Sequence, residues 1–160
     1  MTGLRKPKPL PDMKSPVENF VAQFNAVPVR HFPSLQENAM AHFSRLGIPT
    51  TKNEEWKYTN IIPIFSKDFL FELPAGNLTI EEIEKRLPFI KDNIVVVLEN
   101  GRLNREASLF QHLPQGLEIH TLADARNRTE VLSHYNLYAD VKADAFSALN
   151  TAFANDGLVI

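Results

Sequence analysis

The chain has 160 residues, 44% of them hydrophobic, so it can bury a sizeable core as one compact domain or two small subdomains. Its formal net charge of -2 gives no field that would favour nucleic acid, an acidic substrate or a membrane surface. Because cysteine is absent, disulfides, zinc-thiolate sites and cysteine-held iron-sulfur clusters are excluded within these residues.

The first 15 residues form a basic segment interrupted by prolines. Arg5, Lys6, Lys8 and Lys14 outnumber Asp12, and prolines favour an extended, hydrated backbone. We therefore expect residues 1–15 to be a disordered tail, with a nucleic-acid-binding arm as the alternative. No apolar region of the kind found in signal peptides follows this tail, and the longest apolar runs are too short to span a bilayer. The expectation is a soluble, cytoplasmic protein that binds neither membrane nor nucleic acid.

Capping signals predict that residues 16–93 form a helical N-terminal region. Ser15-Pro16-Val17-Glu18 combines a capping serine, a proline at the first helical position and a glutamate three residues after the cap. Ser34-Leu35-Gln36-Glu37 repeats the capping pattern, and Gly47 marks the end of this second helix. Each helix carries one apolar stripe, formed by Val17, Phe20, Val21 and Phe24 in the first and by Leu35, Ala39, Phe43 and Leu46 in the second.

The remainder of this region is predicted to be less regular. Pro63 excludes a continuous helix across residues 50–71, where we expect a short helical turn at EEWKY and then an extended, well-packed connection. Thr79-Ile80-Glu81-Glu82 is a third capping box. It predicts a short helix that directs Ile80, Ile83 and Leu87 inward and is ended by Pro88.

Residues 94–160 are predicted to mix strands and helices. The β-branched run at 94–98 precedes Asn100-Gly101, which indicates a buried strand and a type I′ hairpin. Residues 116–121 alternate like a further strand, and helical segments are expected at 122–126, 130–135 and 145–153. The last of these would place Phe146, Leu149 and Phe153 on one face. The predicted fold class is therefore α+β, with short helices followed by a small sheet or hairpin.

The chain closes on an apolar strand at 158–160, after a turn at 155–157. A strand with no polar residue after it leaves an open edge that invites pairing. We therefore expect the chain to be a fragment, cut at the first strand of something larger. An isolated fragment of this kind could form a homodimer through the exposed strand.

The segment from Asn53 to Thr59 contains the single tryptophan of the chain, Trp56. Trp56 and Tyr58 would share a face if this segment were extended, and would diverge in a helical turn. One interpretation is that the aromatic rings fill the gap between the helices and the strands. The other is a partner-binding aromatic ledge rimmed by charge.

Motifs that would indicate catalysis are missing from the sequence. No phosphate-binding loop, helical zinc motif or nucleophile elbow occurs, and no histidine has a second histidine at i+3 or i+4. We assign no catalytic, cofactor-binding or metal-ligating residue. An alternative from another class is a small α/β enzyme that uses His120 or His134 with a carboxylate, and it requires polar groups that converge in a cavity.

Four segments, taken in order, resemble the N-terminal part of the SufB/SufD family of the SUF iron-sulfur cluster assembly system. They are GIPTTKNEEWKYTN (47–60), VVVLENGRL (95–103), SLFQHLPQGLEIHTLADA (108–125) and FSALNTAFANDGLVI (146–160). The EEWKYT block lies close to the N-terminus after a short two-helix lead, which resembles the SufD branch more than the SufB branch. Glu55, Trp56, Lys57, Tyr58 and Thr59 match a motif of this family, and we know of no role for it.

The resemblance implies a scaffold subunit that acts through protein contacts and has no catalysis of its own. SufB and the ATPase SufC are the implied partners, in a complex that handles iron-sulfur clusters while SufC binds ATP. In this family a helical N-terminal region leads into a parallel β-helix, so residues 94–160 would lead into a β-helix core that is truncated here. The implied partner surfaces would lie mainly in the missing downstream sequence, and no cofactor is expected in these residues.

Overall fold

The computed structural model describes residues 15–65, 67, 69, 76–87, 89–90, 93–110 and 112–160. Its elements, in chain order, are α1 (Pro16–Ala26), α2 (Pro33–Leu46), the 3-10 helix η1 (Glu54–Trp56), α3 (Ile62–Phe65), α4 (Ile80–Arg86), β1 (Leu98–Glu99), β2 (Arg102–Leu103), β3 (His120–Thr121), α5 (Leu122–Ala125), α6 (Thr129–Leu132), α7 (Ala145–Ala152) and β4 (Leu158–Val159). The strands pair into two small antiparallel sheets, β1 with β2 and β3 with β4. The predicted α+β class is confirmed. The tail up to residue 14 and the stop predicted at Pro88 lie outside the described residues.

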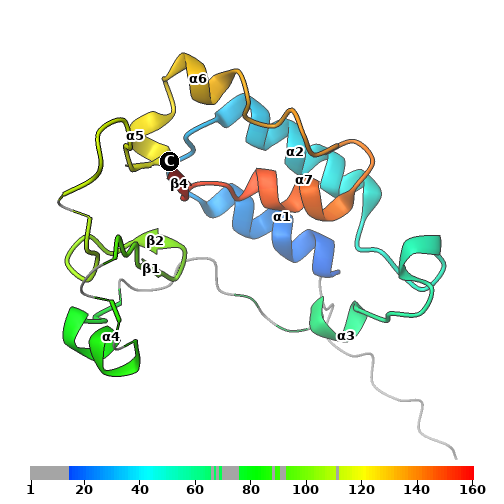
Figure 1. Cartoon of the computed structure of the whole chain (residues 1–160). Helices are drawn as coiled ribbons and strands as arrows, with labels where there is room; N and C mark the ends of the chain where they lie inside the picture. Colours follow the sequence, from blue (N-terminus) through cyan, green and yellow to red (C-terminus); the bar gives the residue numbers. More distant parts are fainter. Residues whose placement is uncertain are drawn as a thin grey trace, which may run out of the picture.

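Three helices enclose the larger hydrophobic core. α1, α2 and α7 lie side by side (Figure 1), and buried residues of all three form one cluster. The rings of Phe20 and Phe43 meet edge to face near its centre, with centroids 5.6 Å apart. Phe65 and Phe69, from the connection that follows α2, also pack on Phe20. The apolar stripes predicted for the first two helices therefore share their core with a helix from the other end of the chain.

The first helix begins as predicted, and the second does not. Ser15 and Glu18 form the reciprocal capping box, in which the Glu18 amide donates to Ser15 Oγ at 3.2 Å and the Ser15 amide donates to Glu18 Oε2 at 2.7 Å. Ser34 was predicted to cap α2, but the helix already begins at Pro33 and no side chain caps it. Proline is tolerated as the first helical residue because the N–H that it lacks would have no partner within the helix. The helix can therefore begin at Pro33, before Ser34. Gly47 ends α2 as predicted, with a φ of 71°.

The three large residues predicted to share a face of the last helix are not its most buried ones. Its most buried residues are small: Ala145, Ala148, Thr151 and Ala152. Small side chains let two helices approach closely, so the three larger residues of α7 flank this contact and are only partly buried; they are Phe146, Leu149 and Phe153. They still contact the core, because Phe153 packs edge to face on Phe24 with centroids 5.9 Å apart.

The connection after α2 is helical where an extended chain was predicted. η1 forms the expected turn within EEWKY, but residues Ile62–Phe65 then form the single turn α3. Pro63 is the second residue of this turn, a position where the missing N–H of proline costs little. The buried Ile61 precedes the turn and holds it against the rest of the molecule.

A second, smaller core lies between α4 and the β1–β2 hairpin, apart from the three-helix core (Figure 1). Thr79 and Glu82 form the predicted capping box of α4. The buried residues of this core are Ile83, Ile90, Val97 and Ala107. Leu87 was predicted to face inward, but it is 57% exposed because the helix has ended at Arg86 and Leu87 no longer follows the helical spacing.

The hairpin forms at the predicted dipeptide. Asn100 and Gly101 both have positive φ, 52° and 83°, as a type I′ turn requires. The strand before it is shorter than predicted and not fully buried, since Leu98 is 49% exposed while Val97 faces the core. Similarly, only His120–Thr121 of the segment predicted at 116–121 forms a strand.

The strand at the end of the chain is paired. β4 lies antiparallel to β3, with His120 opposite Val159 and Thr121 opposite Leu158. The β-helix core predicted to follow this strand stays a prediction. The same holds for the division of the chain between residues 93 and 94. The helix packing itself crosses that division, because α7 closes the core of α1 and α2. In the described part of the chain, no helix is both long enough and apolar enough to cross a membrane.

Candidate functional site

Trp56 is held at the surface by a run of turns. The Trp56 amide donates to the carbonyl of Asn53 at 2.9 Å, and the Thr59 amide donates to the carbonyl of Trp56 at 2.9 Å. The Asn53 side chain in turn accepts from the Thr50 amide at 2.9 Å, which closes the loop after α2. The conformation of the segment is therefore fixed by its own backbone.

The indole ring packs on α7. Trp56 meets Phe146 edge to face with centroids 5.2 Å apart, and Phe146 stacks on Phe65 at 5.6 Å. Trp56 thus joins α3 and α7 through an aromatic chain, as a tryptophan at the rim of a core commonly does. It is only partly buried, so part of the ring still faces solvent.

Tyr58 points away from Trp56. It is 91% exposed, as the turn conformation predicts for residues two apart. Lys57 lies beside it, with Nζ 5.7 Å from the Tyr58 ring centroid and 3.9 Å from Oε1 of Glu54. The motif therefore has a packed part at Trp56 and an exposed part at Tyr58, while partner binding by this motif stays a prediction.

A hollow of about 270 Å³ opens next to the indole. We call it the Trp56 hollow. One side is formed by the end of α2 and the turn after it, and the other by the residues that lead into α7. Its lining consists of Leu46, Gly47, Pro49, Asn53, Glu54, Glu55, Trp56, Ala143, Asp144 and Ala145. The residues that complete it from the C-terminal half carry no motif, so their contact with this hollow could not be predicted from sequence.

Asp144 gives the hollow a fixed negative charge. Its Oδ2 accepts from the Ser147 amide at 2.6 Å and caps the first turn of α7. The pKa of Asp144 is lowered, mainly by its hydrogen bonding to Ser147, so the carboxylate is ionised at neutral pH.

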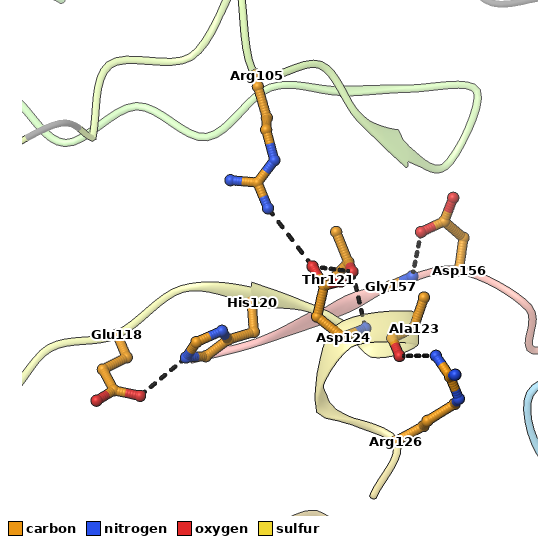
Figure 2. A network of polar contacts seen from close by, with 9 residues as sticks. All are labelled: Arg105, Glu118, His120, Thr121, Ala123, Asp124, Arg126, Asp156 and Gly157. Atoms are coloured by element: carbon orange, nitrogen blue, oxygen red, sulfur yellow. Dashed lines mark hydrogen bonds and ion pairs between the residues drawn. The ribbon is translucent and has the colours of Figure 1, made fainter. Parts of the chain in front are cut away.

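A separate network of polar and charged side chains surrounds β3 (Figure 2). Glu118 Oε2 is 2.8 Å from Nε2 of His120 and also accepts from Arg128 Nη1 at 2.9 Å. On the other side, Thr121 and Asp124 hydrogen-bond to each other in the first turn of α5, and Arg105 approaches Asp124 at 3.5 Å. These groups connect elements across the surface, and Arg105 also lines a hollow of about 880 Å³ beside the start of α4 and the hairpin.

The two histidines of the enzyme alternative have different surroundings. His120 has a carboxylate partner, but the pKa of Glu118 is lowered, first by its hydrogen bond with His120 and then by Arg128. The enzyme alternative requires polar groups that converge in a cavity, but Glu118 and His120 line neither the Trp56 hollow nor the hollows beside α4 and the hairpin turn. His134 contacts the hydroxyl of the exposed Tyr138 and has no carboxylate partner among the described residues. The described residues contain no cluster of three metal-ligating side chains.

The fold and the surface at Trp56 and Tyr58 define the class of protein. It is an α+β domain with an exposed aromatic and acidic patch on a helical core. The family model described as the SufBD protein N-terminal region matches residues 21–160. The chain therefore belongs to the SufB/SufD family of the SUF iron-sulfur cluster assembly system, as the four sequence segments indicated. A comparison with curated proteins found no match.

Proposed function

We propose that the chain belongs to the SufD branch of the family and acts as a non-catalytic scaffold in iron-sulfur cluster assembly. The observation that carries the proposal is the family match over residues 21–160. The assignment to the SufD branch rests on the position of EEWKYT shortly after two helices, α1 and α2. The proposed location is the cytoplasm.

The proposed role is contact with other proteins of the SUF complex. SufB and SufC are the proposed partners, with ATP bound by SufC and the cluster handled by the complex. We propose no ligand to the cluster among these residues, since cysteine is absent from the chain. The exposed Tyr58 and the acidic residues beside Trp56 support a contact role, because aromatic side chains are enriched where proteins bind each other.

Affinity purification from the native cell tests this role. A tag inserted before Met1 in the native gene would recover the whole gene product with its natural partners. Co-purification of both SufB and SufC is the expected result. Recovery of SufD in place of SufB would move the chain to the SufB branch, and recovery of neither SufB, SufC nor SufD would refute the scaffold proposal.

We also propose that the 160-residue chain can self-associate through β4. In the part of the chain that the structure describes, β4 pairs only with β3, so its second edge is unpaired. Light scattering on the purified chain tests this proposal, with an average mass that rises with concentration as the expected result. A constant monomer mass over a wide concentration range would refute it.

A further inference from the structure

We propose that the Trp56 hollow binds an arginine side chain of a partner protein. This inference rests on the proposed scaffold function, because it assigns a chemistry to the partner segment that the domain contacts. Neither the sequence motif nor the family match indicates what this surface recognises.

The first argument is shape. The hollow of about 270 Å³ is open to solvent and has a partly exposed indole on one side. Its other walls carry small or flat residues, Gly47, Pro49, Ala143 and Ala145, which leave space in front of the ring. The volume equals that of about nine water molecules in the liquid, enough for one long side chain and too small for a packed helix.

The second argument is charge. The lining includes three carboxylates, Glu54, Glu55 and Asp144, and none of the described residues that line it is basic. The nearest lysine of the motif, Lys57, lies over Tyr58 and reaches only the edge of this group, at Glu54. Arg45, at the end of α2, is turned to the carbonyl of Lys142. Although Lys57 partly offsets Glu54, three carboxylates against one lysine at the edge leave a net negative charge, which a cationic side chain complements.

The third argument distinguishes arginine from lysine. A planar guanidinium can stack on an aromatic ring while its N–H groups bind carboxylates, whereas an ammonium is a compact and strongly hydrated charge. The chain itself uses this combination: the guanidinium of Arg30 lies 4.2 Å from the Phe24 ring centroid and 3.5 Å from Oε1 of Glu37. The Trp56 hollow is lined by the same kinds of group, an aromatic ring and carboxylates, without an arginine of its own among the described residues.

Nuclear magnetic resonance can test the assignment directly, because the chain has one tryptophan and hence one indole N–H signal. The probe is the blocked tripeptide acetyl-Gly-Arg-Gly-amide, titrated into the ¹⁵N-labelled chain. The matched peptides carry lysine or the neutral isostere citrulline in place of arginine. The expected result is a saturable shift of the indole signal with the arginine peptide, a weaker one with lysine and none with citrulline.

Variants then connect the binding to the carboxylates. Glu54→Gln with Glu55→Gln should weaken arginine-peptide binding about fivefold, while the exposed Glu130→Gln on α6 should leave it unchanged. Both glutamates of the double variant are exposed, so the fold should be kept, and an unchanged amide spectrum outside residues 50–60 verifies this. No shift, an equal shift with citrulline, equal binding of lysine, or full binding by the double variant would overturn the proposal.

A titration with free arginine distinguishes a partner's side chain from a free amino acid as the ligand. Comparison with the affinity purification separates this inference from the proposed scaffold function. Free arginine has an α-ammonium and an α-carboxylate in place of the peptide groups, and a side-chain docking site uses neither, so it should bind no more tightly than the blocked peptide. Tighter binding of the free amino acid would indicate a metabolite site and overturn the docking role. The titration does not depend on SufB or SufC, so its failure and a failure of the affinity purification are distinguishable.

Discussion

At the scale of single residues, Gln36 joins α2 to the end of α7 by hydrogen bonds inside the core. It is fully buried, and its Nε2 donates to the carbonyl of Ala152 at 3.1 Å and to Oδ1 of Asn155 at 2.9 Å. Its Oε1 accepts from the Phe32 amide at 3.0 Å, which satisfies a free N–H at the start of α2. One side chain thus joins the beginning of α2 to the end of α7.

Replacing Gln36 with leucine should destabilise the chain by about 3 kcal/mol, because partners of three hydrogen bonds are left in a buried place. Urea unfolding followed by the fluorescence of Trp56 measures the change. Gln115→Leu is the matched control: Gln115 is exposed in a turn, so its replacement should change the free energy of unfolding by less than about 0.5 kcal/mol. Equal stability of the two variants would show that the Gln36 bonds do not hold the helices together.

The sequence identified Trp56 and Tyr58 as unusual but could not describe their surroundings. The spacing within EEWKY predicts a turn, and the turn fixes the divergence of the two rings. Phe146 and Asp144, which complete the site, lie about ninety residues further along the chain. Their meeting with Trp56 depends on how α7 packs on α2, and no local pattern encodes a contact at that separation.

At the scale of elements, the capping boxes were the most reliable signals, since their reciprocal hydrogen bonds involve only residues three apart. Those of α1 and α4 are present, as is the type I′ turn at Asn100-Gly101. The pattern at Ser34 failed because Pro33 can itself be the first helical residue. For α7, helical spacing drew attention to the largest residues, whereas its most buried residues, at the close helix contact, are small.

This difference between Ser15 and Ser34 leads to a test by substitution. Ser15→Ala should destabilise the chain by about 1 kcal/mol, because the Glu18 amide loses its acceptor at the start of α1. Ser34→Ala should be neutral or slightly stabilising, since Ser34 is exposed inside α2, caps nothing, and alanine is the better helix former. Thermal unfolding monitored by circular dichroism compares the two. A loss at Ser34 as large as that at Ser15 would contradict the observed start of α2.

At the scale of the whole molecule, the two hydrophobic cores form two lobes, one around α1, α2 and α7 and the other around α4 and the hairpin (Figure 1). Composition allowed two small subdomains but could not say which elements would join. Between the lobes, a hollow of about 510 Å³ separates the hairpin turn from the chain around Val29 and Phe153. Two ion pairs cross from one lobe to the other, Arg102 with Asp156 at 4.0 Å and Arg105 with Asp124 at 3.5 Å.

Because the described residues of this joint include exposed ion pairs and an open hollow, the arrangement of the lobes should depend on salt. At 1 M salt the screening length falls to about 3 Å, shorter than the distances of both ion pairs. Spin labels at Lys85→Cys on α4 and Ala41→Cys on α2 can report the separation of the lobes, since the chain has no other cysteine and both positions are exposed. The distance distribution should be narrow at low salt and broad at high salt.

Charge reversal should reproduce the effect of salt without changing the solvent. Arg105→Glu places two carboxylates together at Asp124 and should broaden the distribution at low salt, whereas adding Asp124→Arg restores opposite charges and should narrow it again. Asp124 also caps the first turn of α5 with Thr121, so the recovery should be partial. A distribution that stays narrow under high salt and in both variants would mean that the backbone connections alone fix the lobes, and that the ion pairs contribute nothing to their placement.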